Sequence, residues 1–169
     1  MNRILTATLL IAALAVSACT NPDRFGADGM NNGAANGAGL NGGIIPGSAN
    51  DPASTAYFQQ AVGDRVLFLV DQSNLTPEGQ ATLDGQAAWL NTNTDYQAVI
   101  EGHADEQGTR EYNIALGERR AQSVETYLLN AGVSSSQVTV VSYGEEKPAV
   151  MGSTEYAFAQ NRRGVVVYR

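Results

Sequence analysis

The residues best suited to chemistry lie between positions 101 and 121, in the stretch EGHADEQGTREYNIALGERRA. It reads as the end of a strand, a polar loop punctuated by glycine, and then a helix. His103, Asp105 and Glu106 fall in the loop, and Arg120 falls on the helix. Opposite charges are thus expected at the mouth of one strand–loop–helix unit, an arrangement that suits a ligand carrying both an ammonium and a carboxylate.

Helical spacing predicts where the cationic side chain points. Asn113, Leu116, Arg120 and Val124 share one helix face by the three-and-four rule, and this face is expected to pack on the sheet. Arg119 lies about 100° around the helix and is expected in solvent. A guanidinium held on the inner face favours a planar anion, which it can bind with two parallel hydrogen bonds.

Less specific interpretations of these residues stay open. Asp105 and Arg120 could form a structural salt bridge with each other, and His103 favours a hydrogen-bonded structural histidine over a base or a metal ligand. The sequence has no second histidine, no HExxH and no cysteine cluster for a metal, and no G-x-S-x-G elbow for a triad. Asp105 and Glu106 are chain neighbours, unlike the opposed carboxylates of a glycosidase. The sequence therefore predicts a binding protein without cofactor or metal, not an enzyme.

The N-terminal segment is predicted to be removed on export. Residues 1–18 combine a short positive start with an apolar run too short to span a bilayer comfortably, as in a signal peptide. Val16-Ser17-Ala18-Cys19 resembles a bacterial lipobox, so Cys19, the only cysteine, is predicted to be lipidated. Ordinary cleavage near Ala18 is the alternative. In lipoproteins that resemble this one, a threonine after the cysteine (Thr20) suggests sorting to the outer membrane, with the rest of the chain facing the periplasm.

Composition separates a tether from a globular domain. Residues 19–51 are dominated by Gly, Asn and Ala and are predicted to be a flexible, disordered linker that follows the lipidated cysteine. Residues 52–169 are predicted to form one domain. A formal net charge of -7 argues against bulk attraction to nucleic acid or anionic lipid, so an anionic partner must be bound locally.

The domain is expected to be an α+β fold with helices packed on one mixed sheet. Strands are predicted at 65–70, 97–101, 138–143 and 164–168. Helices are predicted near 54–62, from a cap at Thr76 to about 90, and from a cap at Thr109 to 131, where Gly132 ends the helix. The segment between the last two strands is expected to be irregular.

Three stretches resemble the family of OmpA-like peptidoglycan-binding domains. They are GHADEQGTREYNIALGERRAQSVETYL, VSYGEEKPAV (141–150) and NRRGVVVY (161–168). The resemblance covers residues 65–169 and implies an αβ sandwich with a four-stranded sheet. It also implies non-covalent capture of the peptidoglycan stem peptide at meso-diaminopimelate.

The resemblance assigns roles to five residues. Asp105 would take the ammonium of diaminopimelate, and Arg120 would clamp a carboxylate. Asp71 and Leu116 would complete the peptidoglycan site, and Asn113 would fix the loop.

The resemblance also implies partners. These are Tol proteins, chiefly the periplasmic β-propeller TolB, with a role in holding the outer membrane during cell division. One departure from many relatives is Gln107, where they carry arginine, so one cationic contact could be missing. A hydrolase acting on the wall, or a scaffold that binds mainly periplasmic proteins, are the alternative functions.

Overall fold

A computed structural model describes residues 44–169 of the chain. The predicted signal peptide, Cys19 and most of the predicted linker lie outside the described residues. Residues 44–51, which the sequence analysis assigns to the linker, form turns in which the Asp51 carboxylate accepts hydrogen bonds from the amides of Gly47 and Ala53. The domain boundary at residue 52 stays a prediction.

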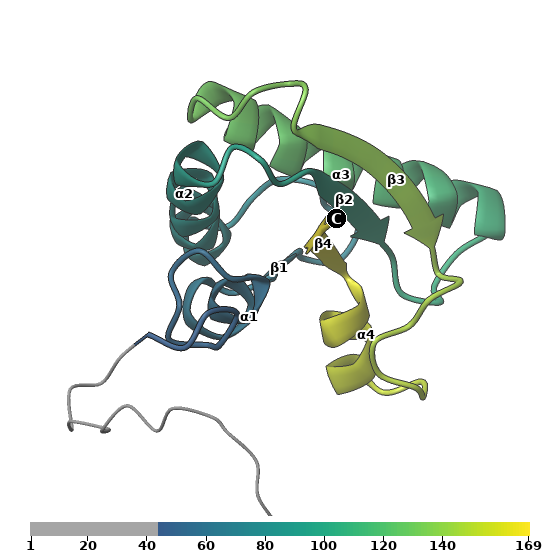
Figure 1. The fold of residues 1–169 in the computed structure, drawn as a ribbon. Coiled ribbons are helices and arrows are strands. Elements are labelled where there is room, and N and C mark those ends of the chain that lie inside the picture. Colours follow the sequence, from purple (N-terminus) through teal and green to yellow (C-terminus); the bar gives the residue numbers. More distant parts are fainter. Residues whose placement is uncertain (1–43) are drawn as a thin grey trace, which may run out of the picture. The chain divides into compact units, whose positions relative to one another are not determined.

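A four-stranded sheet forms the centre of the domain (Figure 1). Its strands are β1 (Arg65–Leu67), β2 (Ala98–His103), β3 (Val138–Gly144) and β4 (Arg163–Tyr168), in the order β1-β4-β2-β3. β2 pairs with β3 in parallel, whereas β4 is antiparallel to both β1 and β2. The predicted mixed sheet with helices packed on it is therefore confirmed.

All three predicted helices form, and the two with predicted caps begin there. A short first helix, α1 (Thr55–Tyr57), continues as a π-helical turn, η1 (Phe58–Val62). α2 (Pro77–Thr92) and α3 (Arg110–Asn130) begin after Thr76 and Thr109, whose hydroxyls accept hydrogen bonds from backbone amides of the first turn. Gly132 follows α3 with a φ of 94°, a left-handed conformation that ends a helix at little steric cost for glycine.

One helix was not expected from the sequence. α4 (Glu155–Asn161) lies in the segment between β3 and β4 that the sequence predicts to be irregular. Thr154 caps it, and Ala157 and Phe158 bury its inner side. A helix of seven residues is too short to show the helical periodicity on which the prediction depended.

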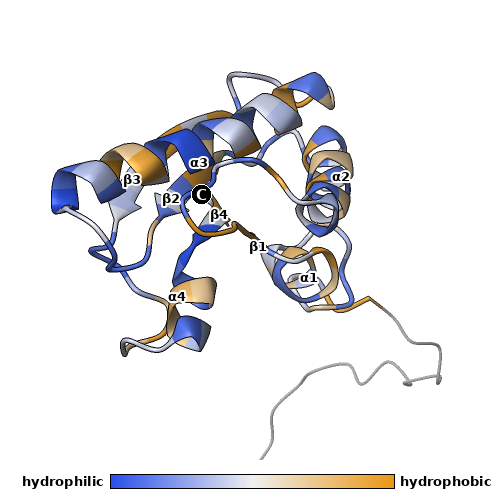
Figure 2. Ribbon diagram, turned by 180° about the vertical axis from the view of Figure 1, so that it is seen from behind, coloured by the Kyte–Doolittle hydropathy of each residue, from blue (hydrophilic) through white to orange (hydrophobic). Residues whose placement is uncertain are grey.

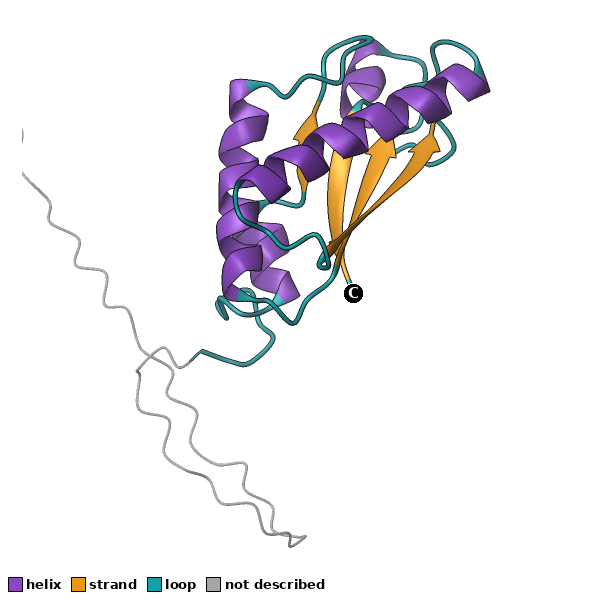
Figure 3. Cartoon of the chain, turned by 90° about the horizontal axis from the view of Figure 1, so that it is seen from above, coloured by secondary structure: helices purple, strands orange, loops and turns teal. Residues whose placement is uncertain are grey.

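α2 and α3 cover one face of the sheet (Figure 3), and α3 approaches β2 very closely. An added Cβ on Gly102 would lie 1.8 Å from the carbonyl oxygen of Gly117 in α3. Only glycine fits at this contact, so the helix axis is fixed against the strand. Arg120, one turn further along α3, is positioned by the same contact.

The topology brings three chain segments together at one end of the sheet, where β1 and β2 finish and β4 begins. β1 and β2 run in the same direction on either side of the antiparallel β4. The segments that follow β1 and β2 therefore meet the segment that precedes β4. Figure 2 shows the loop between β2 and α3 at this end as largely hydrophilic. Among residues 44–169, none of the helices combines the length and the apolar character needed to cross a membrane.

Candidate ligand pocket

A pocket of about 300 Å³ opens at the end of the sheet where β1 and β2 finish. It lies between the segment after β1 and the N-terminal half of α3. Its lining residues are Val70, Asp71, Asp105, Gln107, Gly108, Tyr112, Leu116 and Arg120. Four of the five predicted site residues are thus brought together, two acidic, one apolar and one basic. Asn113, the fifth, is not among the lining residues.

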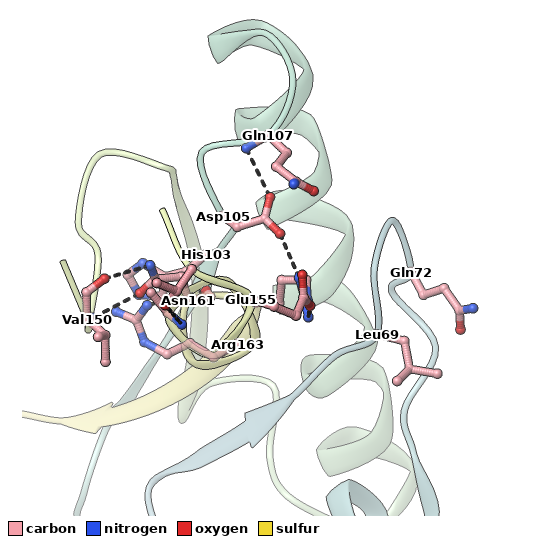
Figure 4. A network of polar contacts seen from close by, with 12 residues as sticks. Leu69, Gln72, His103, Asp105, Gln107, Val150, Glu155, Asn161 and Arg163 are labelled. Atoms are coloured by element: carbon pink, nitrogen blue, oxygen red, sulfur yellow. Dashed lines mark hydrogen bonds and ion pairs between the residues drawn. The ribbon is translucent and has the colours of Figure 1, made fainter. Parts of the chain in front are cut away.

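Asp105 lies two residues beyond β2 and is almost fully buried (Figure 4). One carboxylate oxygen accepts a hydrogen bond of 3.1 Å from the Gln107 amide, and the other lies 2.9 Å from Nη1 of Arg162. Both partners of this ion pair are less than a tenth exposed. The carboxylate is therefore held rigidly, with one cation already beside it.

Arg120 is fully buried and is anchored by backbone carbonyls. Its guanidinium donates to the carbonyl oxygens of Leu69, Gln72 and His103 at 2.8–3.2 Å. Burial lowers the pKa of Arg120 to about 10, which leaves the side chain charged at neutral pH. Of the five N–H groups of a guanidinium, these three bonds use three, so within the described part of the chain two remain for a ligand.

The cation that pairs with Asp105 is Arg162, a residue that the sequence analysis did not single out. Among the residues that the structure describes, Asp105 forms its ion pair with Arg162 and not with Arg120. Arg162 also contacts Glu155 of α4 at 2.7 Å. The two adjacent arginines in Asn161-Arg162-Arg163 could have drawn attention to this position. The pairing of Arg162 with Asp105, 57 positions away, depends on the strand order and is not visible in the sequence. The structural salt bridge between Asp105 and Arg120, left open above, does not form.

Asp71 and Tyr112 form one wall of the pocket. Asp71 is exposed and has a φ of 56°, a left-handed conformation that is uncommon outside glycine. The Tyr112 hydroxyl donates a hydrogen bond to the Asp71 carboxylate, which raises the pKa of Tyr112. Tyr112 is a further site residue that the sequence analysis missed. It is the third residue of α3 and lines the same pocket as Asp105.

Two polar residues are buried behind the pocket. Asn113 donates to the Glu145 carboxylate and so connects α3 to the segment after β3. His103 is 1% exposed, but neither ring nitrogen has a hydrogen-bond partner among the described residues, which corrects the expectation of a hydrogen-bonded histidine. Burial, together with Arg163 and Lys147, lowers the pKa of His103 to about 3, so its ring is neutral. The ring of His103 stacks on that of Tyr143, with a distance of 5.6 Å between the ring centroids.

No group of three or more potential metal-ligating side chains occurs between residues 44 and 169. The pocket instead offers fixed charges of both signs in a small, partly enclosed space. It could hold a small zwitterion by hydrogen bonds and ion pairs.

Comparison with known proteins agrees with this architecture. The family model described as "OmpA family" matches residues 67–162. A peptidoglycan-associated lipoprotein from Mesorhizobium japonicum is 42% identical over 92% of this chain and 86% of its own length. Another from Haemophilus influenzae is 40% identical over 99% of this chain and 100% of its own.

Solved structures show the same fold. The crystal structure of the peptidoglycan-associated lipoprotein from Burkholderia pseudomallei matches with a TM-score of 0.65 and 36% identity, over 70% of this chain and all of the other. The C-terminal domain of MotB from Helicobacter pylori, at 18% identity, matches with a TM-score of 0.59 over 63% of this chain and 84% of its own, and shares the fold.

The chain belongs to the OmpA family and, within it, to the peptidoglycan-associated lipoproteins. The family resemblance expected from the sequence motifs is confirmed. The names of these relatives describe a wall-associated lipoprotein rather than an enzyme, in agreement with the interpretation as a binding protein.

Proposed function

We propose that this protein is an outer-membrane lipoprotein that binds peptidoglycan non-covalently, at the diaminopimelate of the stem peptide. The observation that carries the proposal is the pocket in which Asp71, Asp105 and Arg120 meet. The side chain of diaminopimelate ends in a carbon that bears both an ammonium and a carboxylate. A pocket with fixed anionic and cationic groups matches both charges at once.

The proposed orientation of the diaminopimelate side chain follows from the hydrogen-bonding positions that Asp105 and Arg120 still have free. The ammonium lies toward Asp105 and Asp71. An ionised carboxylate has about four acceptor positions, and Asp105 uses two of them for Gln107 and Arg162. The ligand carboxylate lies toward the two free N–H groups of Arg120 and the amides at the start of α3, where the helix dipole favours an anion.

A calorimetric titration with a diaminopimelate-containing muropeptide tests the assignment. Asp105→Asn keeps the shape of the side chain and removes its charge, so affinity is expected to fall by about 1.5–3 kcal/mol, as for a charge-assisted hydrogen bond. Glu106→Gln is the matched control, because Glu106 is the exposed neighbour and does not line the pocket. Equal losses in the two variants, with both folded by circular dichroism, would contradict the site.

Specificity provides a second test. Lysine at the same stem position has the ammonium but lacks the carboxylate, which would leave the buried Arg120 without its anion. Discrimination of this kind can be large because a polar group in the site loses its partner. A lysine-type muropeptide is therefore expected to bind much more weakly, and equal affinity for the two stems would overturn the orientation.

The anchor at Cys19 belongs to the same proposal. A lipidated Cys19 followed by a linker would hold the domain on the periplasmic side of the outer membrane, near the wall. Stable anchoring needs more than one acyl chain. Mass spectrometry of the mature N-terminal peptide is expected to find an acylated Cys19 as the first residue. An unmodified thiol would contradict it.

We also propose a protein partner of the Tol system, a periplasmic β-propeller resembling TolB, and a role in cell division. This part depends on the family resemblance alone. A purified propeller is expected to bind the domain in a direct titration, and no detectable binding at micromolar concentrations would contradict the partner.

A further inference from the structure

A second, larger groove of about 590 Å³ lies beside the ligand pocket. It lies between the C-terminal half of α3, the segment that leads from β1 to α2, and the start of α2. Arg119, the exposed neighbour of Arg120, lies at its end nearest the pocket. Ser73 and Asn74 line it directly after Gln72, whose carbonyl anchors Arg120. The groove and the proposed binding site are thus separate hollows whose lining residues are neighbours along two segments of the chain.

The groove is lined mainly by neutral side chains that can both donate and accept hydrogen bonds. Five of them have no side-chain hydrogen bond within residues 44–169: Ser73, Asn74, Gln80, Thr126 and Asn130. None of the lining residues is acidic, although the chain carries a net charge of -7. Leu75 and Tyr127, both half-buried, add apolar surface. With Arg119 as its charged lining residue, the groove suits a ligand rich in hydroxyl and amide groups rather than a cationic one.

The spacing between pocket and groove can be compared with a stem peptide. The α3 residues that line the pocket are centred near Leu116, and those that line the groove are centred near Val124. The two sites are therefore about 12 Å apart along the axis of α3, at 1.5 Å per residue. Diaminopimelate is the third residue of the stem, and two residues and a lactyl link join it to the sugar. These three units extend over about 10 Å at about 3.5 Å each. A ligand with diaminopimelate in the pocket therefore reaches the groove with its sugar.

We propose that this groove is a subsite for the N-acetylated amino sugar that carries the stem peptide. The hydroxyl and acetamido groups of the sugar bond to the amide and hydroxyl side chains, and its acetyl methyl group contacts Leu75 and Tyr127. The inference depends on the proposed function, because it requires the stem in the neighbouring pocket.

Two probes separate the subsite from the pocket. One is a disaccharide tripeptide muropeptide, and the other is the same tripeptide without sugar. The purified protein is expected to bind the muropeptide about 5- to 30-fold more tightly, as for one or two net hydrogen bonds. The double variant Asn74→Ala/Thr126→Ala is expected to bring the muropeptide affinity to that of the tripeptide, while tripeptide binding stays unchanged. Gln59→Ala/Thr94→Ala, two exposed polar residues outside the groove, is the matched control.

The outcomes distinguish the two proposals. If both probes bind with equal affinity, or the double variant weakens both equally, the sugar subsite is wrong. The stem-peptide function still stands in that case if Asp105→Asn weakens both probes. If the unmodified protein binds neither probe, both proposals fail. A loss of propeller binding in the double variant, with no change for either probe, would assign the groove to a protein partner and overturn the subsite.

Discussion

The two ends of the sheet are built from different interactions. At the end where β2 begins and β4 finishes, the rings of Phe58, Trp89, Tyr96 and Tyr168 pack with centroid distances of 4.3–6.2 Å. At the opposite end, where β2 finishes and β4 begins, the buried groups are polar and charged: His103, Asp105, Arg120 and Arg162. One end is thus an aromatic cluster and the other a cluster of buried charges.

The difference shows which part of the domain supplies stability and which part supplies the site. Aromatic packing buries large apolar area and contributes further through ring–ring contacts. Buried charges must be removed from water, so even a well-paired ion pair such as Asp105–Arg162 adds little net stability. We infer that the charged end is retained for ligand binding and that the aromatic end offsets its cost.

The largest expected effect is on stability at the aromatic end. Phe58→Ala removes a ring that is 0% exposed and contacts both Trp89 and Tyr168. The free energy of unfolding is expected to fall by about 3–5 kcal/mol, measured by denaturant titration with Trp89 fluorescence. Muropeptide affinity should not change under conditions where the variant is folded. A parallel loss of affinity would show that the two ends are not independent.

The ion pair of the charged end comes next. Asp105→Leu leaves the buried Arg162 with Glu155 as its one ion-pair partner among residues 44–169. The free energy of unfolding is therefore expected to fall by about 2–4 kcal/mol. Adding Arg162→Met replaces the pair by apolar groups and should restore much of that loss in stability, while ligand binding stays weakened. If the double variant is less stable than the single one, the ion pair contributes net stability. The charged end would then stabilise the domain as the aromatic end does, against our inference.

Acid should destabilise the charged end through His103. Its pKa is lowered from 6.5 to about 3 by burial, then by Arg163 and Lys147, so the unfolded chain binds the extra proton first as pH falls. The contribution of neutral His103 to the free energy of unfolding is therefore fully present above pH 6.5. It is lost as the pH falls toward 3, with a slope of up to about 1.4 kcal/mol per pH unit. Glu101 lies 3.5 Å from Nε2, and burial is nevertheless the largest cause of the lowered pKa of His103.

The variant His103→Gln isolates this effect. Denaturant titrations at pH 6.5, 5.5 and 4.5 should give a flatter stability profile for the variant than for the natural protein. Parallel profiles would mean that other groups cause the acid sensitivity and that His103 is not the relevant titrating residue.

The smallest effect is expected at the pocket wall. Tyr112→Phe removes the hydroxyl that bonds to Asp71, which is on the surface, so stability should be nearly unchanged. Muropeptide affinity should fall by about 0.5–1.5 kcal/mol because Asp71 is held less firmly. An unchanged affinity in calorimetry would remove Tyr112 from the site.

Local patterns in the sequence were enough to predict most of this arrangement. The threonine caps and the helical spacing correctly predicted the start of α3 and the burial of Arg120, because both depend on residues only three or four apart. The motifs between residues 101 and 121 correctly indicated the family and hence the sheet. Asp71, Asp105, Leu116 and Arg120 line one pocket, and their roles in binding peptidoglycan stay a prediction.

What the sequence did not reveal depends on contacts between distant segments. Arg162 could pair with Asp105 only because β4 lies between β1 and β2, an order that no local pattern specifies. Arg120 could have bonded to any nearby acceptor, and its three backbone carbonyls come from two separate segments. The short α4 and the absence of a partner for His103 within the described residues likewise become evident only after packing.

The most direct test of the central claim is an NMR titration of the 15N-labelled protein with the diaminopimelate tripeptide. We expect shifts in the amides of residues 69–72 and 104–120, saturating together with one dissociation constant. The amides of Phe58, Trp89, Tyr96 and Tyr168 should stay unmoved. Shifts at the aromatic end, or none around Asp105 and Arg120, would contradict the account of where this protein holds the cell wall.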